Sequence, residues 1–131
     1  NSANFVSLEG GNDSGIELLY TFNKDKKLTG VFQPHLYTRT RDFYQEFADS
    51  LSLLDEVILT DIYPARELPI EGVSSELIYE NLRLGIEKTL CKKEEILDIL
   101  KSKEIEVLIT LGAGDIENYA PQICEILNGQ C

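Results

Sequence analysis

Short apolar runs alternate with amphipathic segments along most of this chain. The runs that predict buried strands lie at 28–32, 56–60, 85–91 and 104–111. Amphipathic helices are predicted at 41–54, from Ser74 onward, at 92–103, and from the Gly-Ala-Gly-Asp segment to about Leu127. Strands that alternate with such helices predict an α/β fold. We expect a doubly wound, mostly parallel sheet of about four to six strands, with helices on both faces.

The first fifteen residues follow a different pattern. Residues 1–15 show no sustained periodicity and are rich in Gly, Asn and Ser, which predicts a loop. We therefore expect a leader over 1–15, either disordered or added in cloning, and one domain over 16–131. The apolar run at 16–22 fits a helix or a strand equally. A length of 131 residues suits one domain with a single core.

Charge and cysteine content exclude several classes of protein. Twelve Lys and Arg face 23 Asp and Glu, a net charge of −11 that repels nucleic-acid phosphates and anionic lipid, so neither partner is expected. The sequence shows no membrane-spanning run and no signal peptide. Three cysteines and one histidine cannot form a common zinc site by themselves, so we expect no metal. Free thiols and a cytoplasmic location are the expectation.

Polar segments follow three of the predicted strands, at 32–42, 60–72 and 110–118. In doubly wound sheets, ligands bind beyond the carboxyl ends of the strands. We therefore expect these segments to form one rim that carries the functional site.

The first segment holds the densest basic cluster of the chain. Its candidate binding residues are His35, Tyr37, Thr38, Arg39 and Arg41. Arginine binds carboxylates through paired hydrogen bonds, and a helix N-terminus adds positive potential, so this cluster indicates an anion site. The alternative is that the arginines pair with Asp42, Glu46 or Asp61 on the surface, and that the histidine is a packed residue bonded to backbone.

The other two segments offer further candidates. Asp61 directly follows a strand and can accept a hydrogen bond from an ammonium group, or can belong to a solvated turn; Arg66 and Glu67 come shortly after it. Gly112 and Gly114 form a Gly-x-Gly turn that can approach phosphate, but the third glycine of GxGxxG is missing. A tight turn is the better interpretation, with the next residue, an aspartate, capping the helix.

Three segments resemble one family. They are VFQPHLYTRTRDFYQEFADSL at 31–51, LTDIYPARELPIEGVSS at 59–75 and ITLGAGDIENYAPQI at 109–123. In this order they are similar to the carboxy-terminal domain of the Mur ligases that join L-alanine to UDP-N-acetylmuramate in peptidoglycan synthesis. The resemblance covers roughly 28–127. It implies a Rossmann-like domain that binds the incoming amino acid, preceded by a UDP-sugar-binding domain and a P-loop ATPase domain.

The resemblance implies an enzyme of which this chain is one part. The chain has no GxxxxGK[ST] motif and lacks the family's Asp-Asp-Tyr-Ala-His-His-Pro motif, so it is expected to be inactive alone. The implied reaction is ATP-dependent amide formation, which serves cell-wall biogenesis, cell shape and cell division. ATP and Mg would be bound mainly by the central domain, and no cofactor by this chain. The implied partners are L-alanine, UDP-N-acetylmuramate and the two other domains.

The resemblance also implies roles for two residues. His35 and Arg39 match positions that help to hold the alanine and the reaction intermediate, with Arg39 on the carboxylate. No catalytic residue is implied in this chain. The family often has an arginine at the position of Leu36, so this rim has one cation fewer. The alternative function is a free-standing α/β module that binds a small anion or a nucleotide; a domain that only docks a partner is a third.

Overall fold

The computed structural model describes residues 4–8, 13–112 and 114–128. The strands in these ranges are β1 (Asn4–Leu8), β2 (Leu28–Phe32), β3 (Glu56–Leu59), β4 (Glu87–Leu90) and β5 (Val107–Leu111). The helices are α1 (Asp13–Phe22), α2 (Tyr37–Leu51), α3 (Glu76–Glu80), α4 (Ile96–Lys101) and α5 (Ala120–Asn128). Two 3₁₀ segments, η1 (Lys93–Glu95) and η2 (Asp115–Tyr119), lead into α4 and α5.

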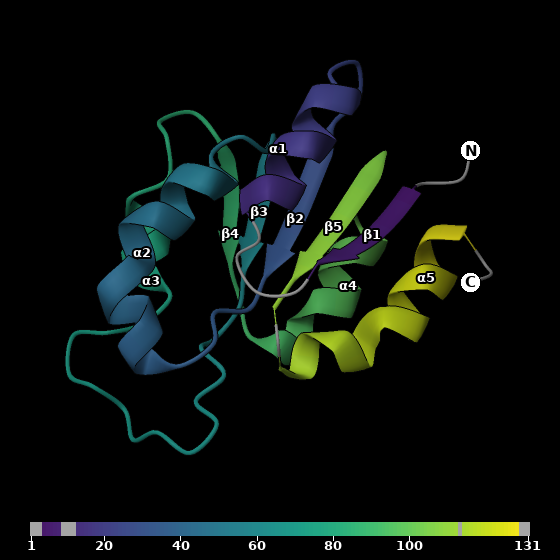
Figure 1. Ribbon diagram of the computed structural model, residues 1–131. Helices are drawn as coiled ribbons and strands as arrows, with labels where there is room; N and C mark the ends of the chain where they lie inside the picture. The colour runs from purple at the N-terminus through teal and green to yellow at the C-terminus, as the bar shows by residue number, and fades with distance from the viewer. Residues whose placement is uncertain (1–3, 9–12, 113, 129–131) are drawn as a thin grey trace.

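The strands form one parallel sheet in the order β1-β5-β2-β3-β4. Helices α1, α2 and α3 cover one face of this sheet, and α4 and α5 cover the other (Figure 1). A separate apolar core fills each side, with Phe32 and Phe47 on the first and Val31 and Ile96 on the second. The predicted Rossmann-like, doubly wound fold is confirmed.

Burial explains which strands the sequence predicts well. Every residue of β2, β3 and β5 is buried, whereas the edge strands β1 and β4 are partly exposed. Strands that are covered on both faces read as continuous apolar runs, so the inner strands stand out in the sequence. β5 begins at Val107 rather than at residue 104, because the preceding Glu-Ile-Glu segment lies before the paired region.

The prediction of an irregular leader is wrong for residues 4–8. They form β1, which pairs with β5 from Asn4 opposite Val107 to Leu8 opposite Leu111. An edge strand of five residues carries too short a pattern to be recognised, and the neighbouring strand gives it its order. The run at 16–22, which fits either pattern, belongs to α1.

The helices differ in part from their predicted ranges, since 3₁₀ segments occupy the predicted first turns of α4 and α5. α2 begins at Tyr37. The sequence predicts a start at residue 41 because the first turn carries polar side chains and the apolar stripe begins only at Phe43. The helix after Ser74 has five residues, and its N-cap is Ser75. The hydroxyl of Ser74 accepts a hydrogen bond from Glu76 N at 3.2 Å, so it still satisfies one amide of the helix start.

The cysteines differ in state. Cys91 is a free, buried thiol, whereas Cys124 is disulfide-bonded, so the prediction of free thiols is wrong for Cys124. Spacing along the chain does not reveal which cysteines the fold brings together. Within the described ranges, none of the helices combines the length and the apolar character that a membrane span needs.

Candidate functional site

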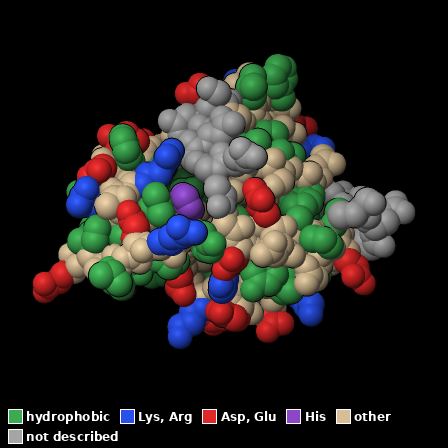
Figure 2. Space-filling view, turned by 60° about the horizontal axis from the view of Figure 1, so that its bottom comes forward, with side chains coloured by type: hydrophobic (Ala, Val, Ile, Leu, Met, Phe, Trp, Pro, Cys, Tyr) green, Lys and Arg blue, Asp and Glu red, His purple; other side chains and the backbone are tan. Residues whose placement is uncertain are grey.

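The three polar segments meet at one edge of the sheet, as predicted. β5, β2 and β3 are neighbours in the sheet, and the segments follow their carboxyl ends. The chain passes from β2 to α2 on one face and from β5 to α5 on the other, so the connections diverge here. Ligands of doubly wound sheets bind at such a point. Figure 2 looks toward this edge and shows the chain's one histidine between side chains of Lys or Arg.

Backbone pairing joins the exits of β2 and β3 beyond the regular sheet. Tyr63 N donates to Pro34 O at 2.8 Å, and Leu36 N donates to Tyr63 O at 2.8 Å. His35 and Tyr63 form an isolated parallel bridge, and their rings stack with centroids 5.7 Å apart and an interplanar angle of 13°. The half-exposed imidazole is therefore held on the rim by the backbone and by an aromatic neighbour.

Gln33 connects the exits of β2 and β5, a role that the sequence analysis missed. Its backbone N donates to Leu111 O at 3.0 Å, and its side-chain Oε1 accepts from Ile116 N at 2.9 Å. The residue is only 3% exposed, so this hydrogen bond satisfies a buried amide. A polar residue between an apolar strand and a proline is the available signal in the sequence.

The two glycines allow the exit of β5 to approach these groups closely. A Cβ on Gly112 would lie 2.7 Å from Ile116 Cγ2, and the φ of 154° disfavours other residues there. A Cβ on Gly114 would lie 2.7 Å from Cγ of the Tyr63 ring. Both glycines therefore serve a tight turn packed against the rim, which agrees with the interpretation favoured from the sequence.

Leu36 holds a strained backbone conformation at the N-cap of α2, with φ 72° and ψ 140°. A non-glycine residue in such a conformation costs on the order of 1–3 kcal/mol. The conformation persists because the Leu36 carbonyl accepts from Thr40 N at 3.2 Å and from Thr40 Oγ1 at 2.8 Å, while its amide is bonded to Tyr63. The first turn of α2 consequently begins directly at the rim.

The two arginines of α2 lie in different environments. Arg41 Nε is 2.8 Å from Asp42 Oδ1, and this hydrogen-bonded ion pair raises the pKa of Arg41 and lowers that of Asp42. Arg39 is exposed, and its guanidinium carbon lies 6.0 Å from the centre of the Phe47 ring. No carboxylate in the described part of the chain forms an ion pair with Arg39. The surface-pair interpretation therefore applies to Arg41, and the charge of Arg39 is available to a ligand.

Glu67 occupies the N-terminus of α2. Its Oε1 accepts from Thr38 N at 3.1 Å, and Thr38 Oγ1 donates to Oε2 at 2.5 Å. These bonds, chiefly the one from the hydroxyl, lower the pKa of Glu67. The positive end of the helix already faces an anion of the chain itself, so a ligand carboxylate would meet the Arg39 side chain rather than the helix backbone.

The remaining candidates lie around the same edge. Tyr37 and the exposed Asp61 line a hollow of about 450 Å³. Arg66 is exposed in the loop that contains Glu67. The residue expected to cap the last helix, Asp115, instead forms an ion pair with Lys93, and this interaction raises the pKa of Lys93. No spacing in the sequence indicates that pair.

Cys91 is the one free thiol in the described part of the chain, and it lies buried just after β4. Burial, with smaller contributions from Glu95 and Asp61, raises the pKa of this thiol to about 11. It is therefore protonated at neutral pH and unsuited to act as a nucleophile. Across the same residues, no group of three or more His, Cys, Asp or Glu side chains is arranged to hold a metal ion.

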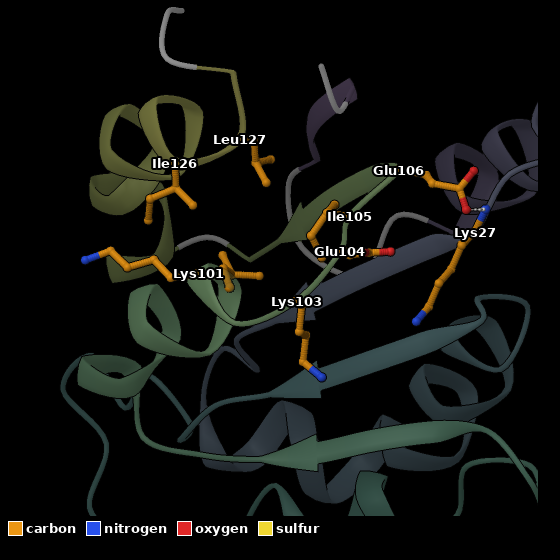
Figure 3. A pocket seen from close by; sticks show the side chains of 9 residues that line it. Lys27, Lys101, Lys103, Glu104, Ile105, Glu106, Ile126 and Leu127 are labelled. Atoms are coloured by element: carbon orange, nitrogen blue, oxygen red, sulfur yellow. Dashed lines mark hydrogen bonds between the residues drawn. The ribbon is translucent and has the colours of Figure 1, made fainter. Parts of the chain in front are cut away.

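Another hollow lies at the opposite edge of the sheet and has a structural explanation. It measures about 710 Å³ and is lined by Lys27, Lys103 and apolar residues of α5 (Figure 3). Lys103 Nζ lies 2.6 Å from the buried carboxylate of Glu56, and Lys27 Nζ lies 3.3 Å from Glu56 and from Glu87. These cations are held in ion pairs between neighbouring segments of the chain. The rim at the carboxyl ends is the better candidate site.

The substitution Gly114→Ala should displace Tyr63 from His35. A Cβ at this position would lie 2.7 Å from Cγ of the Tyr63 ring, and this collision produces the effect. We expect a loss of about 1–3 kcal/mol in the free energy of unfolding, measured in urea. The imidazole proton resonances of the single histidine should shift as well. The same change in a Tyr63→Ala background should cost less, and unchanged imidazole resonances in Gly114→Ala would contradict this packing.

Three known proteins that are similar to this chain carry the same name. No family model matches the chain. The UDP-N-acetylmuramate–L-alanine ligase of Phocaeicola vulgatus is 79% identical over 105 residues, which are 80% of this chain and 23% of that protein. The ligase of the same name from Parabacteroides distasonis is 58% identical over 102 residues, 78% of this chain and 22% of that protein. That of Porphyromonas gingivalis W83 is 48% identical over 120 residues, 91% of this chain and 26% of that protein.

The matches explain why the chain carries only some of the motifs of these ligases. The chain spans about a quarter of the length of these relatives, which is consistent with a carboxy-terminal part. The resemblance drawn from the three rim segments is confirmed: this chain is a relative of one part of the UDP-N-acetylmuramate–L-alanine ligases.

Proposed function

We propose that this chain is the amino-acid-positioning domain of a cytoplasmic UDP-N-acetylmuramate–L-alanine ligase of peptidoglycan synthesis. The observation that carries the proposal is the 79% identity to a relative of that name over 80% of the chain. In the reaction implied for this family, ATP phosphorylates the muramoyl carboxylate. The neutral amine of L-alanine then attacks the acyl phosphate, an amide forms and phosphate leaves.

The geometry of the rim supports a positioning role. The charge of Arg39 is not taken up by an ion pair with a described carboxylate, and a planar guanidinium can bind the alanine carboxylate through two hydrogen bonds. His35 lies at the same edge, four residues before Arg39, and is held by Tyr63. With its carboxylate held, the amino acid can present its nitrogen to the acyl carbon, and such orientation lowers a barrier by several kcal/mol in favourable cases, up to about 7–11.

The remaining chemistry requires other parts of the enzyme. The chain has no GxxxxGK[ST] loop to cradle the ATP phosphates, and its described residues offer no three-ligand carboxylate or histidine cluster for Mg. ATP and Mg would therefore be bound mainly by another domain, which supplies the phosphoryl transfer. The partners proposed are that domain, the UDP-sugar-binding domain and the two substrates.

A nucleotide-binding or small-anion-binding module remains the alternative. The rim gives it less support, because Arg41 is paired with Asp42, Glu67 satisfies the start of α2, and the Gly-Ala-Gly turn is followed by a carboxylate. Calorimetric titration of the chain with ATP and with UDP distinguishes the two proposals, since only the alternative predicts binding.

The isolated chain should not turn over the ligase substrates. Mixed with ATP, Mg²⁺, UDP-N-acetylmuramate and L-alanine, it should release no phosphate above background, because it lacks the phosphate-binding loop. The full-length Phocaeicola vulgatus ligase serves as the positive control. Phosphate release by the chain that depends on L-alanine would contradict its assignment as one domain of three.

The substitution Arg39→Ala should weaken the use of L-alanine selectively. The test uses a chimera in which the aligned part of this chain replaces the corresponding 105-residue stretch of the Phocaeicola vulgatus ligase. Loss of a charged hydrogen-bond partner costs about 1.5–3 kcal/mol, so KM for L-alanine should rise roughly tenfold to a hundredfold while KM for ATP is unchanged.

The matched control is Arg41→Ala on the same helix, where the guanidinium is paired with Asp42. This variant should leave both KM values near those of the parent chimera. Equal effects of the two substitutions, or unchanged alanine kinetics in Arg39→Ala, would remove Arg39 from the site. A parent chimera without activity would contradict the proposed function itself.

A further inference from the structure

The first turn of α2 lacks a cap from its own sequence. The N-cap residue is Leu36, which has no side-chain acceptor, and the first turn contains no acidic residue. The first amides of any α-helix have no partner within the helix and need an acceptor from elsewhere. Here the acceptor is the carboxylate of Glu67, which lies 29 positions after Thr38 in sequence.

The loop that carries Glu67 is attached to the rim at two points. At one end, Tyr63 is bonded to Pro34 and Leu36 through its backbone. At the other end, Glu67 binds Thr38 through both carboxylate oxygens. Between them, Glu67 N donates to Pro64 O at 2.9 Å, and this turn includes a residue with a φ of 53°, Ala65. The segment from Tyr63 to Glu67 is therefore attached to the start of α2 at both of its ends.

Arg39 lies between two threonines that are both held by other segments. Thr38 is bonded to Glu67, and Thr40 is bonded to the Leu36 carbonyl through its amide and its hydroxyl. The backbone from which the Arg39 side chain extends is thus fixed on both sides. Without Glu67, the Thr38 side of this support would be lost, while the Thr40 side would remain.

We infer that Glu67 is a positioning residue for the amino-acid substrate. By capping the first turn of α2 through Thr38, it holds Arg39 where the guanidinium can bind the substrate carboxylate. The inference rests on the proposed function of the rim. It assigns no substrate contact to Glu67, whose carboxylate oxygens are both engaged by Thr38. A displacement of about 1 Å in a positioning group can lower a rate a hundredfold, so the loss of this support is measurable.

Kinetics of the chimera test this inference. Glu67→Ala should raise KM for L-alanine about tenfold and leave KM for ATP unchanged. Glu67→Gln should stay within about threefold of the parent, because the amide oxygen can accept from Thr38 N and the amide nitrogen can donate to Thr38 Oγ1. The matched control is Glu71→Ala, an exposed glutamate in the same loop, which should behave like the parent. A structural defect alone would not raise one KM selectively, nor be rescued by the amide.

The pair Thr38 and Glu67 should act as one unit. The double variant Thr38→Ala/Glu67→Ala should raise KM for L-alanine no further than Glu67→Ala alone, whereas additive effects would indicate that Thr38 contacts the substrate directly. In the 131-residue chain itself, Glu67→Ala should accelerate hydrogen exchange of the Thr38 amide about tenfold relative to Glu71→Ala, together with the small fall in the urea midpoint that the loss of a helix cap produces.

Two results would overturn the inference. One is a Glu67→Ala chimera with the alanine KM of its parent; the other is a Thr38 amide whose exchange does not respond to Glu67→Ala. If Arg39→Ala raises KM for L-alanine and Glu67→Ala does not, the proposed function stands and the positioning role is wrong. If neither variant changes that KM, the failure lies in the proposed function.

Discussion

The backbone bonds between the exits of β2 and β3 determine where the candidate side chains lie. Tyr63 bonds to Pro34 and to Leu36, which extends parallel pairing past the end of the regular sheet. His35 is thereby stacked on Tyr63, and Leu36 is held in the strained conformation that starts α2 at the rim. Because these are bonds within the chain, the rim has its shape before any ligand arrives, and binding need not supply the ordering free energy.

Ion pairing then distinguishes Arg39 from Arg41, the other arginine of the first turns of α2. The chain carries a net charge of −11, and several of its cations are paired with nearby carboxylates. These pairs include Arg41 with Asp42, Lys93 with Asp115, and Lys103 with Glu56. Arg39 instead lies against an aromatic ring at the edge where three strands end. A guanidinium without an ion pair suits a small carboxylate, while the net negative charge of the chain repels polyanions, which agrees with the proposed amino-acid substrate.

The inner strands and the location of the rim could be predicted, because burial on both faces gives continuous apolar runs and because polar segments follow those runs. What could not be predicted depends on contacts between residues far apart in sequence. β1 is ordered by β5, the start of α2 is capped by Glu67, and Gln33 satisfies an amide of the exit of β5. Gln33 leaves only a weak local signal, a polar residue before a proline, and the other two contacts leave none. A helix whose cap comes from another loop is therefore predicted to start too late.

Nuclear magnetic resonance titration of this chain tests the central claim most directly, with L-alanine compared with L-alaninamide, which lacks the carboxylate. If Arg39 grips that carboxylate, L-alanine should shift the resonances of His35 and of the first turn of α2, and alaninamide should leave them in place. Equal shifts with both compounds would contradict the claim. The absence of a shift with L-alanine at concentrations approaching 0.1 M would contradict it as well, since a Kd of that order corresponds to a binding free energy of only about −1.4 kcal/mol.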